Sequence, residues 1–266
     1  MIHLREARLA AAPERSAFPF DLPAVRSLRT LRFETPVTLL VGENGSGKST
    51  VLEALAIAAR AITAGTAEAE DDPTLEGVRT LARAMTLTWA RRTHRGFFLR
   101  AEDFFGYAKR MATLRADLAA GLAAVDAEYA GRPGLAHDLA RTPWLRELGE
   151  LQHRYGDGLD AQSHGGSFLR FFQARLVPGG TYFLDEPEAP LSPARQLGFL
   201  ALLKELVEAD GQAVIATHSP ILLAFPGATI WSFDGDAIAP VAYQDLEHVR
   251  LTRDFLANPE AFLRHL

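Results

Sequence analysis

The most restrictive feature of the chain is the octapeptide Gly-Glu-Asn-Gly-Ser-Gly-Lys-Ser at residues 42–49, which fits the pattern G-x-x-x-x-G-K-[ST]. The apolar run Val37–Val41 precedes it, and residues 49–62 follow it with the apolar spacing of a helix. The segment therefore predicts a strand, a glycine-rich loop and a helix, which is the setting that this pattern requires. An ordinary glycine turn before a helix explains the glycines but neither Lys48 nor Ser49.

In a loop of this kind, backbone N–H groups and the helix N-terminus surround the phosphates of a nucleotide, because both favour an anion. The lysine reaches the β- and γ-phosphates, and the hydroxyl group that follows it binds Mg²⁺. We therefore expect ATP and Mg²⁺ as ligands. The expected nucleotide-binding residues are Glu43, Asn44, Gly45, Ser46, Gly47, Lys48, Ser49 and Thr50.

Two adjacent carboxylates end a second apolar run, Thr-Tyr-Phe-Leu at residues 181–184. In the P-loop scheme the first carboxylate, Asp185, holds Mg²⁺ together with Ser49, and the second, Glu186, polarises the attacking water. Taken alone, such a pair equally fits a solvated turn. The presence of Lys48 in the same chain favours the catalytic interpretation.

A histidine, His218, follows a third apolar run at residues 213–217. Parallel α/β sheets present their ligand-binding residues at the carboxyl ends of the strands. The place of His218 therefore fits contact with a γ-phosphate, and it also fits a structural histidine beside a strand.

In combination, these segments resemble the ABC-type ATPases, and more closely the soluble ABC-like group often labelled AAA-family ATPases. The resemblance covers nearly the whole chain and includes a signature-like segment, Gln-Ser-His-Gly-Gly at residues 162–166. It implies ATP hydrolysis with Lys48, Glu186 and His218 as catalytic residues. It also implies a homodimer on ATP binding, because in this family the signature completes the γ-phosphate site of the opposite subunit.

The signature departs from the Leu-Ser-Gly-Gly-Gln pattern of transporters. His164 replaces the first glycine and Gly166 replaces the glutamine, so that Ser163 and Gly165 are the retained residues. A plain glycine-rich helix start remains open as an alternative for this segment. The dimer depends on this resemblance, since composition alone does not indicate it.

The resemblance implies an α/β fold: a P-loop NTPase head of the ABC type, with a mostly parallel sheet, an antiparallel β subdomain and a small helical lid. We expect a single domain over residues 1–266, with a helical insertion at about residues 101–156 broken near residues 131–134 and Pro143. Residues 85–90 and 96–100 predict one hairpin, and Asp-Gly-Asp at 234–236 predicts the turn of another. Residues 246–266 predict a closing amphipathic helix.

Three assignments stay open. No glutamine stands at the entry to the insertion, where Glu102 is the candidate for coupling the lid to the nucleotide. Phe18 or Phe20 fits an adenine-stacking role, and either equally fits the core. Arginines and phenylalanines interleave over residues 79–110, which fits nucleic-acid contact but is better explained by a solvated arginine face over a phenylalanine core.

The amino-acid composition limits the kinds of partner and compartment that we expect for the chain. The chain has 28 basic and 33 acidic residues and a net charge of −5, which gives no general attraction to nucleic acid. It holds no cysteine, and its apolar stretches fall short of the ~20 residues of a membrane span, so we expect a cytoplasmic protein. A separate effector protein is expected, and nucleic acid stays possible. The alternatives to a partner-driving ATPase are an ATP-gated interaction module in defence or repair and the ATP-binding subunit of a transporter.

Overall fold

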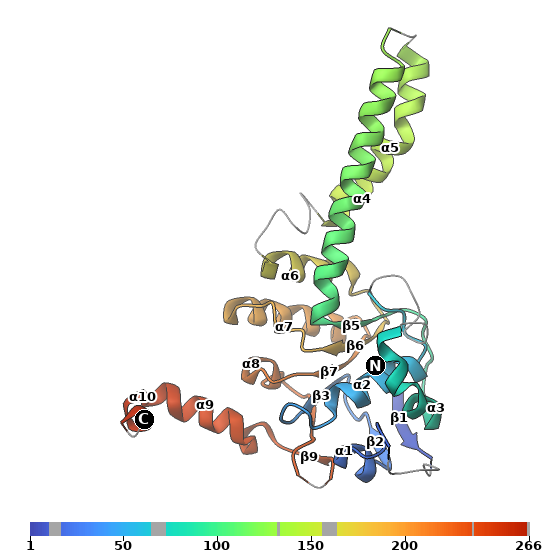
Figure 1. The fold of residues 1–266 in the computed structure, drawn as a ribbon. Helices are drawn as coiled ribbons and strands as arrows, with labels where there is room; N and C mark the ends of the chain where they lie inside the picture. Colours follow the sequence, from blue (N-terminus) through green and yellow to red (C-terminus); the bar gives the residue numbers. More distant parts are fainter. Residues whose placement is uncertain (11–16, 65–72, 132–133, 156–163, 236, 265–266) are drawn as a thin grey trace.

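The computed structural model describes residues 1–10, 17–64, 73–131, 134–155, 164–235 and 237–264. The chain forms an α/β head from which two segments project, the helix pair α4–α5 and the C-terminal helices α9 and α10 (Figure 1). No helix among the described residues combines the length and the apolar character needed to cross a membrane.

The head is built on a six-stranded sheet with the order β5-β6-β7-β3-β8-β9. Neighbouring strands are parallel except β8 and β9, which form the antiparallel hairpin that the Asp-Gly-Asp turn predicts. Because the strands run in one direction, their carboxyl ends meet at one edge of the sheet. The strands are β3 (Val37–Val41), β5 (Phe98–Arg100), β6 (Thr181–Asp185), β7 (Gln212–Ala216), β8 (Thr229–Ser232) and β9 (Ala239–Pro240).

A second, antiparallel sheet has the order β2-β1-β4 and comprises β1 (Leu4–Leu9), β2 (Thr30–Arg32) and β4 (Met85–Trp89). The predicted hairpin of residues 85–90 and 96–100 is therefore wrong, because β4 pairs with β1 and β5 pairs with β6. Gly96 shows the physical reason: with φ 120° it lies so close to β6 that a Cβ atom would stand 1.8 Å from the Thr181 carbonyl oxygen. The pairing of β4 and β5 with strands distant in sequence is therefore more favourable than a hairpin between them.

One buried side chain joins the two sheets. Gln212 Oε1 accepts hydrogen bonds from the backbone N–H groups of His3 and Leu4 at 3.0 and 2.8 Å, and its Nε2 donates to the Leu4 carbonyl at 2.9 Å. Gln212 is fully buried. The start of β1 is thereby fixed to the start of β7.

The central sheet is covered on both faces, as its continuously buried strands require. Along β3, Leu39 packs into one core and Leu40 into the other, with the alternation expected of a strand. One core is rich in phenylalanine and includes residues of α6 (His164–Arg175), α7 (Pro193–Glu208) and α8 (Pro220–Leu223). The other includes residues of α1 (Pro23–Ser27), α2 (Lys48–Ala58), η1 (Pro73–Val78), α3 (Arg79–Ala84) and the small sheet.

Helix α2 ends earlier than the sequence spacing predicts. It stops at Ala58, and Arg60 adopts a left-handed φ of 54°. The chain then runs beside β5, where Phe98 N–H donates to the Ile62 carbonyl at 2.8 Å and Ala64 N–H donates to the Phe98 carbonyl at 2.9 Å. The apolar residues at 62–64, which continue the helical pattern in the sequence, thus pair with β5 instead of extending α2.

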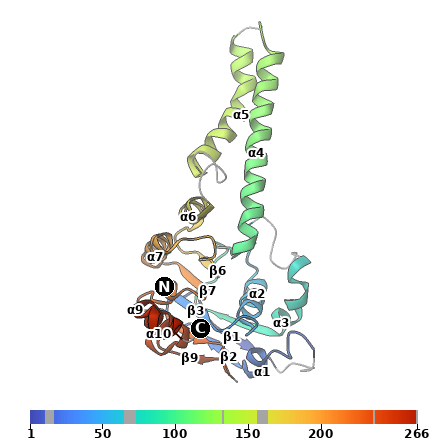
Figure 2. The same cartoon turned by 60° about the vertical axis from the view of Figure 1, so that its left-hand side comes forward.

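Two long antiparallel helices, α4 (Ala101–Glu128) and α5 (Gly134–Tyr155), form an arm that stands away from the head in both views (Figure 2). Pro143 lies inside α5 and does not break it, so the predicted interruption there is wrong. Gly121 of α4 faces Trp144 of α5, since a Cβ atom at Gly121 would lie 2.3 Å from the indole ring.

The C-terminal segment contains η2 (Tyr243–Asp245), α9 (Glu247–Ala257) and α10 (Pro259–Leu263). The predicted single closing helix is wrong in two respects. The Asn258 side chain caps a new helix that starts at Pro259, and the pair projects from the head instead of covering it (Figure 1). Apolar residues such as Leu256, 70% exposed, consequently face outward.

Candidate nucleotide-binding site

The glycine-rich loop follows β3 and ends in α2, as the sequence predicts. Gly45 and Gly47 have φ values of 82° and 96°, a left-handed conformation that favours glycine. Gly47 is the N-cap of α2, and no side chain caps this helix end. The loop therefore turns sharply and directs the N-terminus of α2 toward the carboxyl edge of the sheet, where an anion is favoured.

Lys48 lies over this loop. Its Nζ atom donates hydrogen bonds to the carbonyl oxygens of Gly42 and Glu43 at 2.7 and 2.9 Å, and the side chain is buried. Burial lowers the pKa of Lys48, and the nearby carboxylates of Glu186 and Asp185 oppose that shift. The lysine is thus positioned at the loop and surrounded by acidic groups.

Ser49 and Asp185 come together from opposite sides of the site. Ser49 Oγ donates to Asp185 Oδ1 at 3.1 Å. Asp185 is 8% exposed, and burial raises its pKa to about 6, although the Ser49 hydrogen bond opposes the shift. Because burial disfavours the ionised form of Asp185, a cation next to the carboxylate would stabilise that form.

These two oxygens fit Mg²⁺. Adjacent ligands of an octahedral Mg²⁺ ion, each about 2.1 Å from the metal, lie about 3 Å apart, and both donors are the hard oxygens that this ion prefers. Among the described residues there is no cluster of three or more acidic, histidine or cysteine ligands. Mg²⁺ commonly binds through one or two protein oxygens together with phosphate and water, so this small donor set suits the ion.

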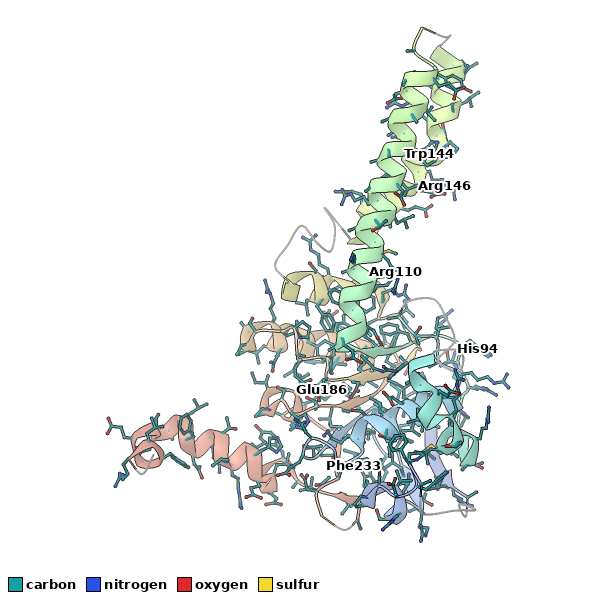
Figure 3. All side chains as sticks on the ribbon, viewed as in Figure 1. His94, Arg110, Trp144, Arg146, Glu186 and Phe233 are labelled. Atoms are coloured by element: carbon teal, nitrogen blue, oxygen red, sulfur yellow. The ribbon has the colours of Figure 1, made fainter. Side chains whose placement is uncertain are left out.

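Glu186 follows Asp185 and has a φ of 47°, which is unusual for a residue with a side chain. Its N–H donates to the Ala216 carbonyl at 2.9 Å, and its Oε1 lies 3.5 Å from His218 Nε2. Burial lowers the pKa of His218, Lys48 lowers it further, and Glu186 raises it. Glu186 lies in the head, far from Trp144 of the arm (Figure 3).

Glu188 holds the His218 segment in place, a role that sequence reasoning missed. One carboxylate oxygen, Oε1, accepts hydrogen bonds from Thr217 Oγ1 at 2.6 Å and from the N–H groups of His218 and Ser219 at 2.8 and 3.2 Å. Burial raises the pKa of Glu188. No local pattern reveals this role, because the three donors follow a different strand.

A buried ion pair lies beside Asp185, and sequence reasoning missed it too. Arg100 Nε is 3.1 Å from Glu53 Oε1, and both side chains are less than one-fifth exposed. Burial raises the pKa of Glu53 to about 7 in spite of the arginine. Glu102, by contrast, is 76% exposed and lies 3.4 Å from Arg100. A cavity of about 510 Å³ brings these residues together with Ser49, Asp185 and Glu186.

A larger cavity of about 790 Å³ lies over the glycine-rich loop. It is lined by residues 42–46, by His218 and Asp234, and by the C-terminal segment that includes His248. Asp234 Oδ1 accepts a hydrogen bond from the Glu43 N–H at 2.7 Å, so the hairpin turn after β8 supports the loop. Sequence reasoning did not place Asp234 and His248 at this cavity.

The two adenine-stacking candidates lie outside this cavity. Neither Phe18, 55% exposed, nor Phe20, which packs against the core, lines this cavity. Ser163 lies outside the described residues. Gly165 is in the first turn of α6. The structure thus brings together residues 42–49, Asp185, Glu186 and His218, whereas the place of Ser163 in the signature segment lies outside the described residues.

Comparison with known proteins supports the fold and the assignment of the glycine-rich loop. A family model described as an AAA domain matches residues 22–72, which contain the loop and α2. No curated protein matches the chain in sequence. A nucleotide-free ATP-binding cassette from an ABC transporter matches in structure with a TM-score of 0.50 and 16% identity, over 100% of this chain and 99% of that chain.

Two further structures are similar at lower scores. An inward-facing putative metal-chelate type ABC transporter matches with a TM-score of 0.49 and 16% identity, over 96% of this chain and 90% of that chain. The Smc head domain from Pyrococcus furiosus, with an extended coiled coil and bound to the C-terminal domain of ScpA, matches with a TM-score of 0.46 and 11% identity, over 96% and 100%.

The cassette matches over the full chain, and the loop, the two acidic residues and the histidine occupy neighbouring strand ends of one parallel sheet. The chain therefore has the fold of an ATP-binding cassette, and its residues 22–72 match the AAA-domain family model.

Proposed function

We propose that the chain binds ATP with Mg²⁺, hydrolyses it in a homodimer that forms on ATP binding, and uses the cycle to change the conformation of a partner protein. The observation that carries this proposal is the convergence of three distant segments. Ser49 Oγ lies 3.1 Å from Asp185 Oδ1, and Glu186 Oε1 lies 3.5 Å from His218 Nε2, next to the glycine-rich loop.

Binding is assigned to the loop. Its N–H groups and the N-terminus of α2 surround the phosphates, and Lys48 exchanges its carbonyl partners for the β- and γ-phosphate oxygens. Ser49 and Asp185 would hold Mg²⁺, which neutralises charge on the phosphate oxygens when it is bound.

Hydrolysis is assigned to Glu186, which orients the attacking water and accepts its proton. Because the pKa of His218 is lowered, this side chain is neutral at neutral pH. His218 Nε2 lies 3.5 Å from Glu186 Oε1 and makes no hydrogen bond to the described residues. In the tautomer that carries its proton on Nε2, a small approach lets His218 donate to Glu186 and keep the carboxylate directed at the water. In the dimer, Ser163 and Gly165 of the second copy close the γ-phosphate side.

The substitution Glu186→Gln tests this mechanism. We expect kcat to fall by about 100-fold or more, because an amide accepts no proton, while ATP binding is retained. The variant should accumulate an ATP-bound dimer in size-exclusion chromatography. The matched control is Glu150→Gln on α5, an exposed carboxylate far from the site, which should hydrolyse ATP at the parent rate.

Two results would count against the proposal. Turnover by Glu186→Gln at the parent rate would remove Glu186 from catalysis. A variant that stays monomeric with saturating ATP would contradict the dimer while leaving ATP binding intact.

The projecting arm favours a second candidate function, an ATP-gated interaction module for an effector or nucleic acid. Helices α4 and α5 offer a long surface that is separate from the nucleotide site (Figure 2). In such a module the ATP-bound dimer is the active state and hydrolysis is slow. Tight ATP binding with negligible turnover in the parent protein would favour this candidate.

A further inference from the structure

The cavity over the glycine-rich loop has a second wall that the mechanism above does not use. One wall is formed by residues 42–46, His218 and Asp234. The other is formed by Leu246, Glu247, His248 and Leu251, at the start of α9. The C-terminal helix therefore begins at the site where the phosphates are expected.

His248 has an unusual environment within this wall. Its Nε2 atom is buried and has no hydrogen-bond partner among the described residues. Buried polar atoms are nearly always paired, so an unpaired one on a residue that lines a cavity points to a partner that the described residues do not supply.

The neighbours of His248 place it near the phosphates. The charge of His248 disfavours the charged form of His218, and Asp234 favours the charged form of both histidines. His218 adjoins Glu186, and Asp234 is bonded to the Glu43 N–H of the loop. Burial lowers the pKa of His248, which leaves a neutral imidazole able to donate one hydrogen bond.

We propose that His248 binds the terminal phosphate of the nucleotide through Nε2–H and thereby fixes the position of helix α9. This inference rests on the proposed ATP binding and adds a residue and an element to it. The consequence is that nucleotide occupancy controls a helix whose C-terminal end carries exposed apolar residues, among them Phe255 and Leu256.

The test compares three variants of the full chain: His248→Ala removes the donor, His248→Asn keeps an N–H donor, and His94→Ala is the control. His94 is exposed and lies on the surface of the head (Figure 3). Equilibrium binding is measured with fluorescent ATP and ADP, and circular dichroism checks folding. We expect His248→Ala to raise the Kd for ATP by about tenfold or more and the Kd for ADP much less, because a hydrogen bond to a charged group is lost. The asparagine variant should recover part of the affinity, and His94→Ala should match the parent.

Hydrogen exchange gives a second readout. In the parent, ATP should slow exchange over residues 247–257, and in His248→Ala this protection should be lost although ATP is saturating. If His248→Ala binds ATP as tightly as the parent, or keeps the protection, the inference about His248 is wrong and the proposed function stands. If the parent itself does not bind ATP, the proposed function is wrong.

Discussion

At the residue scale, the charged groups beside Asp185 connect the site to the elements around it. Glu53 stands one helical turn after Ser49, and Arg100 is paired in register with Asp185. The Arg100–Glu53 pair at 3.1 Å therefore links α2 to the strand end beside the site. Arg100 is also the N-cap residue of α4, so the same pair fixes the base of the arm.

The raised pKa of Glu53, from 4.5 to about 7, predicts a pH-dependent stability. The Glu53 carboxyl group binds its proton more tightly in the folded protein than in the unfolded chain. The resulting stabilisation of the fold is complete below pH 4.5 and is lost as the pH rises through 7. Relative to Glu53→Gln, which carries no such proton, the parent should lose about 2 kcal/mol of unfolding free energy between pH 5 and pH 8.

Urea denaturation of both proteins with EDTA and without nucleotide measures this difference. The exposed control Glu150→Gln should stay parallel to the parent at both pH values. A gap between parent and Glu53→Gln that does not change with pH would show that Glu53 has an ordinary pKa in the fold.

The residues that sequence could identify are those in short patterns with a fixed chemical meaning. The loop residues, Asp185, Glu186 and His218 belong to this group, and the structure brings them together. Glu188 and His248 could not be found in this way, because their partners come from other segments of the chain. Their roles arise from packing and leave no local pattern.

At the scale of elements, the arm depends on close contact between its two helices. Gly121 lets Trp144 pack directly on the α4 backbone, where a Cβ atom would stand 2.3 Å from the ring. We expect Gly121→Ala to displace the indole, to change the Trp144 fluorescence and to lower the stability of the arm by about 1–3 kcal/mol, as overpacking does.

Gly149→Ala is the matched control, since a Cβ atom there meets nothing within 4 Å. This change on α5 should stabilise the arm slightly, because alanine favours a helix more than glycine does. ATP binding by the head should be unchanged in both variants. An unaltered fluorescence spectrum and melting curve for Gly121→Ala would contradict the close contact.

The elements that the sequence predicted well are those with a clear apolar pattern or a characteristic turn sequence. The parallel strands β3, β6 and β7 and the β8–β9 hairpin follow the prediction. The hairpin of residues 85–100 failed because β1 and β6 supply better partners than the local turn does. The early end of α2 has the same origin, since residues 62–64 bond to the backbone of Phe98.

At the scale of the whole molecule, the head, the arm and the C-terminal helices meet around one site. Helix α4 starts beside Asp185, and α9 starts beside the glycine-rich loop. Both projecting segments are thus rooted where ATP is proposed to bind, which is the arrangement that a nucleotide-dependent change of shape needs. Sequence could predict that residues 101–155 are helical, but the direction of the arm depends on packing at its base.

The proposed ATP dimer predicts a thermal stability that depends on protein concentration. Any ligand at 100 times its Kd adds about 2.7 kcal/mol, which for a chain of this size raises Tm by about 5–10 °C. For Glu186→Gln with Mg·ATP, the increase in Tm should grow further as protein concentration rises, because a higher concentration favours the association of two copies. With ADP the increase should not depend on protein concentration, and Lys48→Ala should show little increase with either nucleotide. Scanning fluorimetry over a hundredfold range of protein concentration measures this directly. An ATP-induced shift that is the same at every concentration would mean that the nucleotide is bound by a monomer, and the closing of each site by a second copy would then be wrong.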